Sequence, residues 1–122
     1  MPTVLFVDDD PAILVTFPRM LRREPYEIVV AESAAKALAI LDSRPVQVVV
    51  TDQQMPGMRG TELLERVHER YPLTVRMILT GEPGSSTVIE VGRTVHHVLR
   101  KPASADEIKR AIASALESSS AS

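Results

Sequence analysis

The sequence of 122 residues contains no cysteine and no tryptophan, and only two tyrosines and two phenylalanines. Without cysteine the chain forms no disulfide, no cysteine-ligated zinc or iron–sulfur site and no thiol nucleophile. Aromatic residues make up 3% of the chain, so few rings are available to stack on nucleobases or on a flavin. No apolar run is longer than five residues, whereas a membrane-spanning helix needs about 20. These absences favour a small soluble domain in a reducing compartment.

The chain also lacks an excess of charge of either sign. It carries 14 Lys and Arg against 16 Asp and Glu, for a formal net charge of −2. A basic surface for nucleic acid or anionic lipid is therefore not indicated, and we expect direct binding to neither. The N-terminus has no cationic segment leading into an apolar stretch, so it does not resemble a signal peptide. We expect one globular domain in the cytoplasm.

Short β-branched segments alternate with longer segments of helical periodicity. The expected strands are Thr3–Val7, Tyr26–Ala31, Val46–Thr51, Val75–Thr80 and Val95–Leu99. They are nearly continuous in Val, Ile and Leu, a pattern typical of parallel strands buried on both faces. The expected helices follow Asp10, Ser33 and Ser104, and occupy Gly60–Arg70 and Ser86–Arg93. This alternation predicts an α/β fold, a single doubly wound five-stranded parallel sheet with helices on both faces.

Local signals mark several helix ends. Asp10 before Pro11 is typical of an N-cap followed by proline in the first turn. Ser104 with Glu107 three residues later predicts a capping box for the last helix. Pro18 lies inside the first expected helix, where proline costs about 3 kcal/mol or forces a kink. We expect residues 1–117 to form the domain, and the Ser-rich residues 118–122 to be a flexible tail or the start of a linker.

Polar residues follow the ends of four expected strands. Asp8–Asp10 follow the first strand, Asp52 follows the third, Thr80 ends the fourth and Lys101 comes shortly after the fifth. Ligands of open α/β sheets bind beyond the carboxyl ends of the strands. Each residue alone also has a structural explanation, as a helix cap, a turn or loop carboxylate, a strand end or a surface charge. Together they predict one polar site at this edge of the sheet.

The chemistry of that site follows from its charges. Three carboxylates close together repel one another and raise their pKa values unless a cation is present. Mg²⁺ prefers oxygen ligands and keeps coordination positions open for phosphate oxygens. A carboxylate beside Mg²⁺ and an ammonium group can attack a phosphoryl group to give an aspartyl phosphate. Asp52, Thr80 and Lys101 supply a nucleophile, a hydroxyl and an ammonium for such a transfer.

Four short motifs carry a resemblance to a known family. They are Phe6-Val7-Asp8-Asp9, Asp52 followed by Gln-Gln-Met-Pro-Gly, Leu79-Thr80-Gly81, and Lys101-Pro102. Each is weak alone, but the four in this order, each at a strand end, are highly specific. Over residues 3–117 the chain resembles the receiver domain of two-component response regulators, much as in chemotaxis receivers. The resemblance implies the flavodoxin-like strand order 2-1-3-4-5.

The resemblance also implies roles for individual residues. It implies that Asp52 is the phosphoacceptor, that Thr80 and Lys101 contact the phosphoryl group, and that the Lys101–Pro102 bond is cis. The implied Mg²⁺ ligands are Asp8, Asp9, Asp52 and the main-chain carbonyl of Gln54. By the same resemblance Gly81 leaves room for the phosphodonor or water, while Gln54 and Glu82 tune dephosphorylation.

One position departs from the family pattern. Receivers usually carry Tyr or Phe three residues before the lysine, and this chain has Val98 there. The aromatic half of the usual switch is therefore missing, although Thr80 remains.

The resemblance implies a sensor histidine kinase or a phosphotransfer protein as donor, and an output domain or partner protein that binds the face of helix four, strand five and helix five. It implies a monomer or a weak phosphorylation-dependent dimer, and no enzymatic activity beyond self-phosphorylation and self-dephosphorylation.

Three other functions remain open at this point. A pseudo-receiver would share the fold and act only as a protein-binding module. Asp8 and Asp10 are similar in spacing to the nucleophile and acid–base pair of haloacid-dehalogenase-type phosphatases, in which Asp8 would be phosphorylated. Against that, Ala12 replaces the usual Thr or Val. A flavodoxin-like electron carrier shares the topology, but the few aromatic residues disfavour a flavin site.

Overall fold

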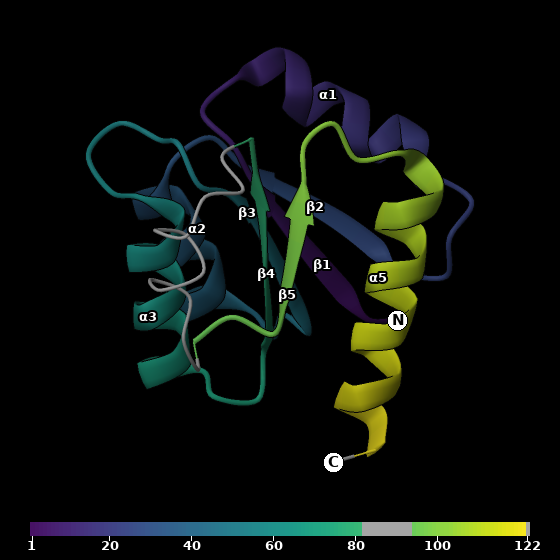
Figure 1. Ribbon diagram of the computed structural model, residues 1–122. Coiled ribbons are helices and arrows are strands. Elements are labelled where there is room, and N and C mark those ends of the chain that lie inside the picture. The colour runs from purple at the N-terminus through teal and green to yellow at the C-terminus, as the bar shows by residue number, and fades with distance from the viewer. Residues whose placement is uncertain (82–93, 122) are drawn as a thin grey trace.

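The computed structural model describes residues 1–81 and 94–121 and contains a five-stranded parallel sheet (Figure 1). The strands are β1 (Thr3–Val7), β2 (Glu27–Ala31), β3 (Val48–Asp52), β4 (Val75–Thr80) and β5 (His97–Arg100). Their order across the sheet is β2-β1-β3-β4-β5, with every neighbouring pair parallel. The expected flavodoxin-like order is confirmed. The strands β2, β3 and β5 begin one or two residues later than predicted.

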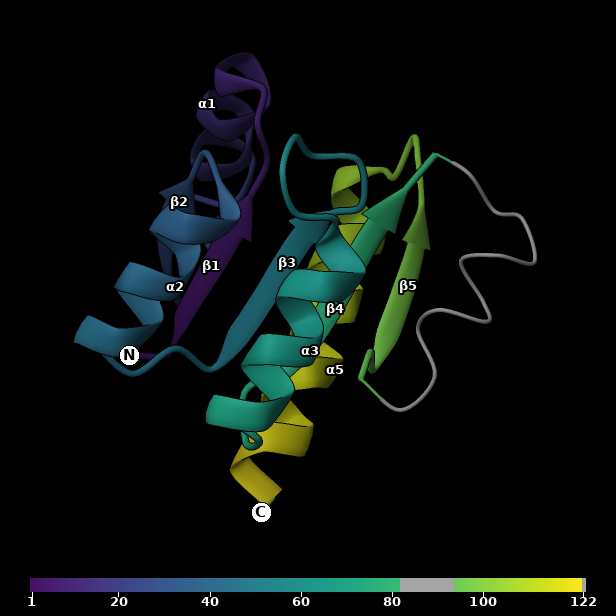
Figure 2. The ribbon, with the colours of Figure 1, turned by 90° about the vertical axis from the view of Figure 1, so that its left-hand side faces the viewer.

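Helices cover both faces of the sheet (Figure 2). In the described part of the chain they are α1 (Pro11–Met20), α2 (Ala34–Ser43), α3 (Gly60–Arg70) and α5 (Ala105–Ala121). The helices α1 and α5 lie on one face, and α2 and α3 lie on the other (Figures 1 and 2). The helix expected over Ser86–Arg93 falls outside the described residues. No helix in the described ranges has the length and apolar character needed to cross a bilayer.

The core consists of two apolar layers separated by the sheet. Side chains of a strand point alternately to opposite faces, so Val4 and Phe6 of β1 pack toward α1 and α5. Leu5 and Val7 pack toward α2 and α3. The rings of Phe6 and Phe17 stack with centroids 4.2 Å apart and join β1 to α1. The central strands are buried on both faces, which is why most of their residues are apolar.

The two edge strands are more exposed than expected. Exposed side chains alternate with half-buried ones in β5, where Val98 is 45% exposed. In β2 two half-buried residues lie between exposed Glu27 and Val30, which is 37% exposed. An edge strand has a neighbouring strand on one side only, and solvent reaches side chains that the helices do not cover. The prediction that all five strands are buried on both faces is therefore wrong for β2 and β5.

The predicted helix caps are present. Asp10 accepts a hydrogen bond from the Ala12 N–H at 2.9 Å, with Pro11 in the first turn. Ser33 accepts from the Lys36 N–H at 3.1 Å. Ser104 and Glu107 form the expected reciprocal pair, with N–H to side-chain oxygen distances of 3.1 and 3.3 Å. These caps fix where each helix begins after its strand.

Two features of the helices differ from simple sequence rules. The helix α1 continues through Pro18 to Met20, so this proline lies in its last turn rather than ending it. The helix α5 continues to Ala121, past the domain end that we expected at residue 117. That residues 118–122 are a flexible tail or the start of a linker stays a prediction. That segment contains only serine and alanine, with no glycine or proline to terminate a helix.

Candidate functional site

Three carboxylates meet at the carboxyl edge of the two central strands. Asp52 is the last residue of β3, Asp8 and Asp9 follow β1, and β1 pairs directly with β3. One oxygen from each carboxylate lies within 4.8 Å of the others. Asp8 is 4% and Asp52 is 6% exposed, whereas Asp9 is open to solvent. The sheet topology therefore brings together the acidic residues that the sequence places some 40 positions apart.

Asp8 is held in an unfavourable electrostatic environment. Burial raises the pKa of its carboxyl above the ordinary value of 3.8, and the nearby carboxylates of Asp52 and Asp9 raise it further. The Asp10 N–H, which donates to Asp8 Oδ1 at 2.9 Å, and the Lys101 ammonium act in the opposite direction. The backbone of Asp8 is fixed by its N–H, which donates to the Ala31 carbonyl of β2 at 3.1 Å. The cluster thus carries more negative charge than its neighbours neutralise.

Lys101 supplies the positive charge of the site. Its Nζ lies 2.6 Å from Asp52 Oδ1, a contact that joins residues 49 positions apart. The backbone N–H of Lys101 donates to the Thr80 carbonyl at 2.8 Å, which extends the pairing of β4 with β5 up to the lysine. The Lys101–Pro102 peptide bond is cis, as expected. Thr80 is 1% exposed at the end of β4.

The donor set fits a hard divalent cation. Three carboxylates offer oxygen ligands within a few ångströms of one another, and Mg²⁺ is bound in proteins by such oxygens and by water. A cation would also offset the repulsion from Asp52 and Asp9, which adds to the effect of burial in raising the pKa of Asp8. Gln54 follows the strand that carries Asp52 by two residues, and its side chain is exposed.

The other predicted site residues lie in different surroundings. Gly81 follows β4, and a Cβ built on it would meet no atom of the described residues within 4 Å. Val98 is paired in register with Ile78 of β4 and is 45% exposed on the outer strand. Glu82 lies outside the described residues.

Two residues beside Asp52 were missed by the sequence analysis. Gln53 is 0% exposed and contacts the first turn of α3, and a Cβ on Gly60 would lie 2.4 Å from the Asp52 carbonyl oxygen. The local sequence gives one indication of such a contact, which is Arg59 at the N-cap position of α3. An arginine there has no side-chain acceptor for the first N–H groups of the helix. The acceptors had to come from elsewhere in the chain.

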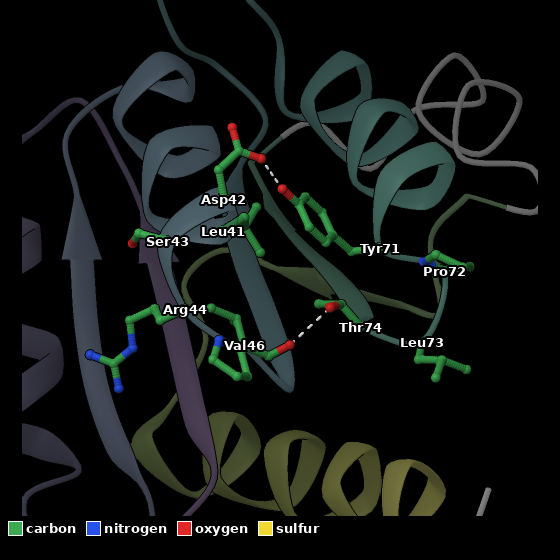
Figure 3. Close-up of a pocket in the computed structure, with 10 residues that line it drawn as sticks. Leu41, Asp42, Ser43, Arg44, Val46, Tyr71, Pro72, Leu73 and Thr74 are labelled. Carbon is green, nitrogen blue, oxygen red and sulfur yellow. Dashed lines mark hydrogen bonds between the residues drawn. The ribbon is translucent and has the colours of Figure 1, made fainter.

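Two cavities lie at different distances from the carboxylate cluster. One of about 590 Å³ lies between the end of α2 and the loop before β4, lined by Leu41, Tyr71 and Leu73 among others (Figure 3). Its residues precede β3 and β4, so it lies at the opposite end of the sheet from Asp52. A second cavity of about 410 Å³ lies between α1 and α5 and touches Asp8 and Lys101. Within the part of the chain that the structure describes, the one group of three carboxylates close enough to share a cation lies at the carboxyl edge.

Comparisons with known proteins agree on the family. The family model for the response regulator receiver domain matches residues 4–113. The hydrogenase transcriptional regulatory protein HoxA of Cupriavidus necator is 34% identical over 119 residues, which cover 94% of this chain and 24% of the relative. The transcriptional regulatory protein GlrR of Escherichia coli K12 is 36% identical over 118 residues, covering 95% of this chain and 26% of the relative. The chain thus spans about a quarter of the length of these curated relatives.

Solved structures show the same likeness. The signal receiver domain of an HD domain-containing protein from Pseudomonas fluorescens Pf-5 superposes with a TM-score of 0.94 at 33% identity, covering 99% of this chain and 98% of that one. A CheY-like receiver domain protein from Methanospirillum hungatei JF-1 superposes with a TM-score of 0.93 at 27% identity, covering 98% and 97%. The chain belongs to the response regulator receiver domains of two-component signalling systems.

Proposed function

We propose that this domain is a phosphoacceptor that receives a phosphoryl group on Asp52 from a histidine kinase or a phosphotransfer protein. An oxygen of the Asp52 carboxylate forms a bond to phosphorus as the bond from phosphorus to the donor's histidine nitrogen breaks. The contact of 2.6 Å between Lys101 Nζ and Asp52 Oδ1, beside the Asp8 and Asp9 carboxylates, is the observation that carries this proposal. Phosphoryl transfer depends chiefly on alignment and on neutralising charge, and these residues provide both.

Asp8, Asp9, Asp52 and the Gln54 carbonyl would hold Mg²⁺ in the proposed site. When bound, Mg²⁺ supplies positive charge that neutralises the carboxylates and the phosphoryl oxygens. Lys101 pairs with the phosphoryl group in place of the free carboxylate, and the Thr80 hydroxyl donates to one of its oxygens. We assign Gly81 the role of leaving space for the donor or for water. Gln54 and Glu82 tune how long the phosphate persists.

The phosphorylated state signals through a surface that includes β5 and lies away from Asp52. Phosphorylation replaces the charge of one carboxylate with about −1.5 to −2, and the Thr80 hydroxyl and the Lys101 ammonium follow the new oxygens. We propose that this shifts a face that includes β5, α5 and the helix expected over Ser86–Arg93, to which an output domain or partner protein binds. The domain acts as a monomer or a weak phosphorylation-dependent dimer, and its only chemistry is its own phosphorylation and dephosphorylation.

Intact-mass spectrometry after incubation with a small-molecule acyl phosphate tests this function. We expect one added phosphate that requires Mg²⁺ and is absent in Asp52→Asn. Asp8→Asn separates the phosphatase alternative, because a phosphate that persists in Asp52→Asn and disappears in Asp8→Asn would identify Asp8 as the nucleophile. The structure disfavours that outcome, since Asp10, the acid–base partner in that alternative, is engaged as the N-cap of α1. A folded protein that takes no phosphate would be a pseudo-receiver.

A further inference from the structure

Gln53 is a fully buried glutamine directly after the proposed phosphoacceptor. It is 0% exposed, and a buried carboxamide is costly unless it is hydrogen-bonded. Its Oε1 accepts the Thr61 N–H at 2.9 Å, and its Nε2 donates to Thr61 Oγ1 at 3.4 Å. Thr61 is 5% exposed, so both partners lie in the interior. The side chain therefore crosses the loop of residues 54–59 and fastens its two ends together.

These contacts serve as a helix cap supplied from a distance. The first N–H groups of a helix have no partner within it, and Arg59 in front of α3 has no side-chain acceptor to offer. The Gln53 carbonyl accepts the Gly60 N–H at 3.1 Å, while Gln53 Oε1 accepts that of Thr61. One residue of the strand end thus satisfies the first two donors of α3.

The same anchor fixes the backbone of Asp52. The Gln53 N–H donates to the Leu79 carbonyl of β4 at 3.0 Å, which holds the strand end on its other side. Gly60 approaches so closely that a Cβ there would lie 2.4 Å from the Asp52 carbonyl oxygen and 3.0 Å from Gln53 Cα. The peptide that follows the Asp52 carboxylate is therefore held between β4 and α3.

We propose that Gln53 is a positioning residue for phosphoryl acceptance, acting through Asp52 and through the Gln54 carbonyl. This inference rests on the proposed function and extends it to a residue outside the charged cluster. Transfer requires the carboxylate to meet phosphorus in line, and a displacement of about 1 Å can reduce the rate by a factor on the order of 100. The anchor keeps the Asp52 carboxylate against Lys101 while the proposed ligands of Mg²⁺ on the same segment stay in place.

The variant Gln53→Met tests the proposal, because it retains side-chain length and removes both hydrogen-bonding atoms. We expect the maximal rate of labelling by saturating acyl phosphate to fall by about tenfold or more, and the dissociation constant for Mg²⁺ to rise severalfold. Thr61→Ser keeps the hydroxyl and the N–H, and we expect it to behave as the parent protein does. The control is Ser33→Ala, which removes the side-chain cap of a different helix, α2, and leaves both hydrogen bonds of the Gln53 side chain intact.

Urea unfolding separates positioning from a general loss of stability. Gln53→Met and Ser33→Ala should lower the urea midpoint by similar amounts, yet only the first should lose rate and Mg²⁺ affinity. Equal rates and equal affinities in the two variants would overturn the proposal. If Gln53→Met folds poorly, Thr61→Val removes the hydroxyl partner alone, and a parental rate with parental Mg²⁺ affinity in that variant overturns it as well. If the parent protein takes no phosphate, the proposed function fails, and the ratio of Mg²⁺ affinities still decides the role of Gln53.

Discussion

The Asp8 carboxyl is almost inaccessible to water and yet lies among other carboxylates. Its 4% exposure and the neighbouring Asp52 and Asp9 all raise its pKa. A group whose pKa is higher in the folded state than in the unfolded chain favours the folded state when protonated. The stability of the metal-free protein therefore falls as the pH rises from the ordinary Asp value of 3.8 through the raised folded value. The buried charge of Asp8 thus lowers the stability of the metal-free protein, while it offers a ligand for the proposed cation.

We predict that Asp8→Asn stabilises the metal-free protein at neutral pH by about 1 kcal/mol, because it removes a buried charge. Urea unfolding with a chelator present measures the difference, which should shrink below the ordinary pKa of the carboxyl. In saturating Mg²⁺ the order should reverse, since a ligand stabilises the state that binds it. A parent protein that is as stable as the variant at neutral pH without metal would contradict the charge argument.

At the scale of elements, the end of a strand and the start of a helix are in direct contact beside the site. The helix α3 begins against the carbonyl of the residue that ends β3, and Gly60 permits that approach because it has no Cβ. No atom of the described residues lies within 4 Å of a Cβ built on Gly81 at the end of β4. The two glycines therefore look alike in sequence but differ in what surrounds them.

We predict that Gly60→Ala destabilises the domain by roughly 1–3 kcal/mol, because the new methyl group forces β3 and α3 apart. It should also lower the rate of Mg²⁺-dependent labelling, since the displaced carbonyl belongs to Asp52. Thermal unfolding and mass spectrometry provide the two measurements. Gly81→Ala is the matched control, and we expect its unfolding to remain within about 0.5 kcal/mol of the parent. A Gly60→Ala protein as stable as this control would show that the contact is easily relieved.

At the scale of the whole molecule, the site is joined to its proposed output through one edge of the sheet. Lys101 connects β5 to Asp52, and the Lys101 N–H connects β5 to the end of β4. Val98 lies on the outer side of this connection, half-exposed and without a ring. Its counterpart on the opposite edge is Val30 of β2, which is also partly exposed.

We predict that Val98→Tyr strengthens the coupling of phosphorylation to β5 and α5. A ring at this edge can occupy alternative buried and exposed positions, so it adds an element whose equilibrium the phosphate biases. The measurement is the set of amide chemical-shift changes that phosphorylation causes, which should be larger over β5 and α5 in the variant. Val30→Tyr on the other edge is the control and should leave the pattern as in the parent. Identical patterns in Val98→Tyr and the parent would refute the coupling.

Much of the fold was predictable because its signals are local. Continuous Val and Ile runs indicate central parallel strands, and the caps at Asp10, Ser33 and Ser104 mark helix starts within three residues of their partners. The carboxylates and the lysine could be assigned to one edge because parallel strands end at the same side of a sheet. The exposure of β2 and β5 and the helical extent of residues 118–121 were not predicted.

The sequence by itself determined the α/β alternation, the residues at the carboxyl edge and the membership of the receiver family. Only the tertiary structure decided that Gln53 caps α3, that Gly60 presses on Asp52, and that Asp8 is buried against like charges. The physical reason is the range of the interactions. Helix periodicity and caps act within a few residues, whereas burial, the pKa of a carboxyl and a cap supplied by another element depend on which distant segments the folded chain places beside one another.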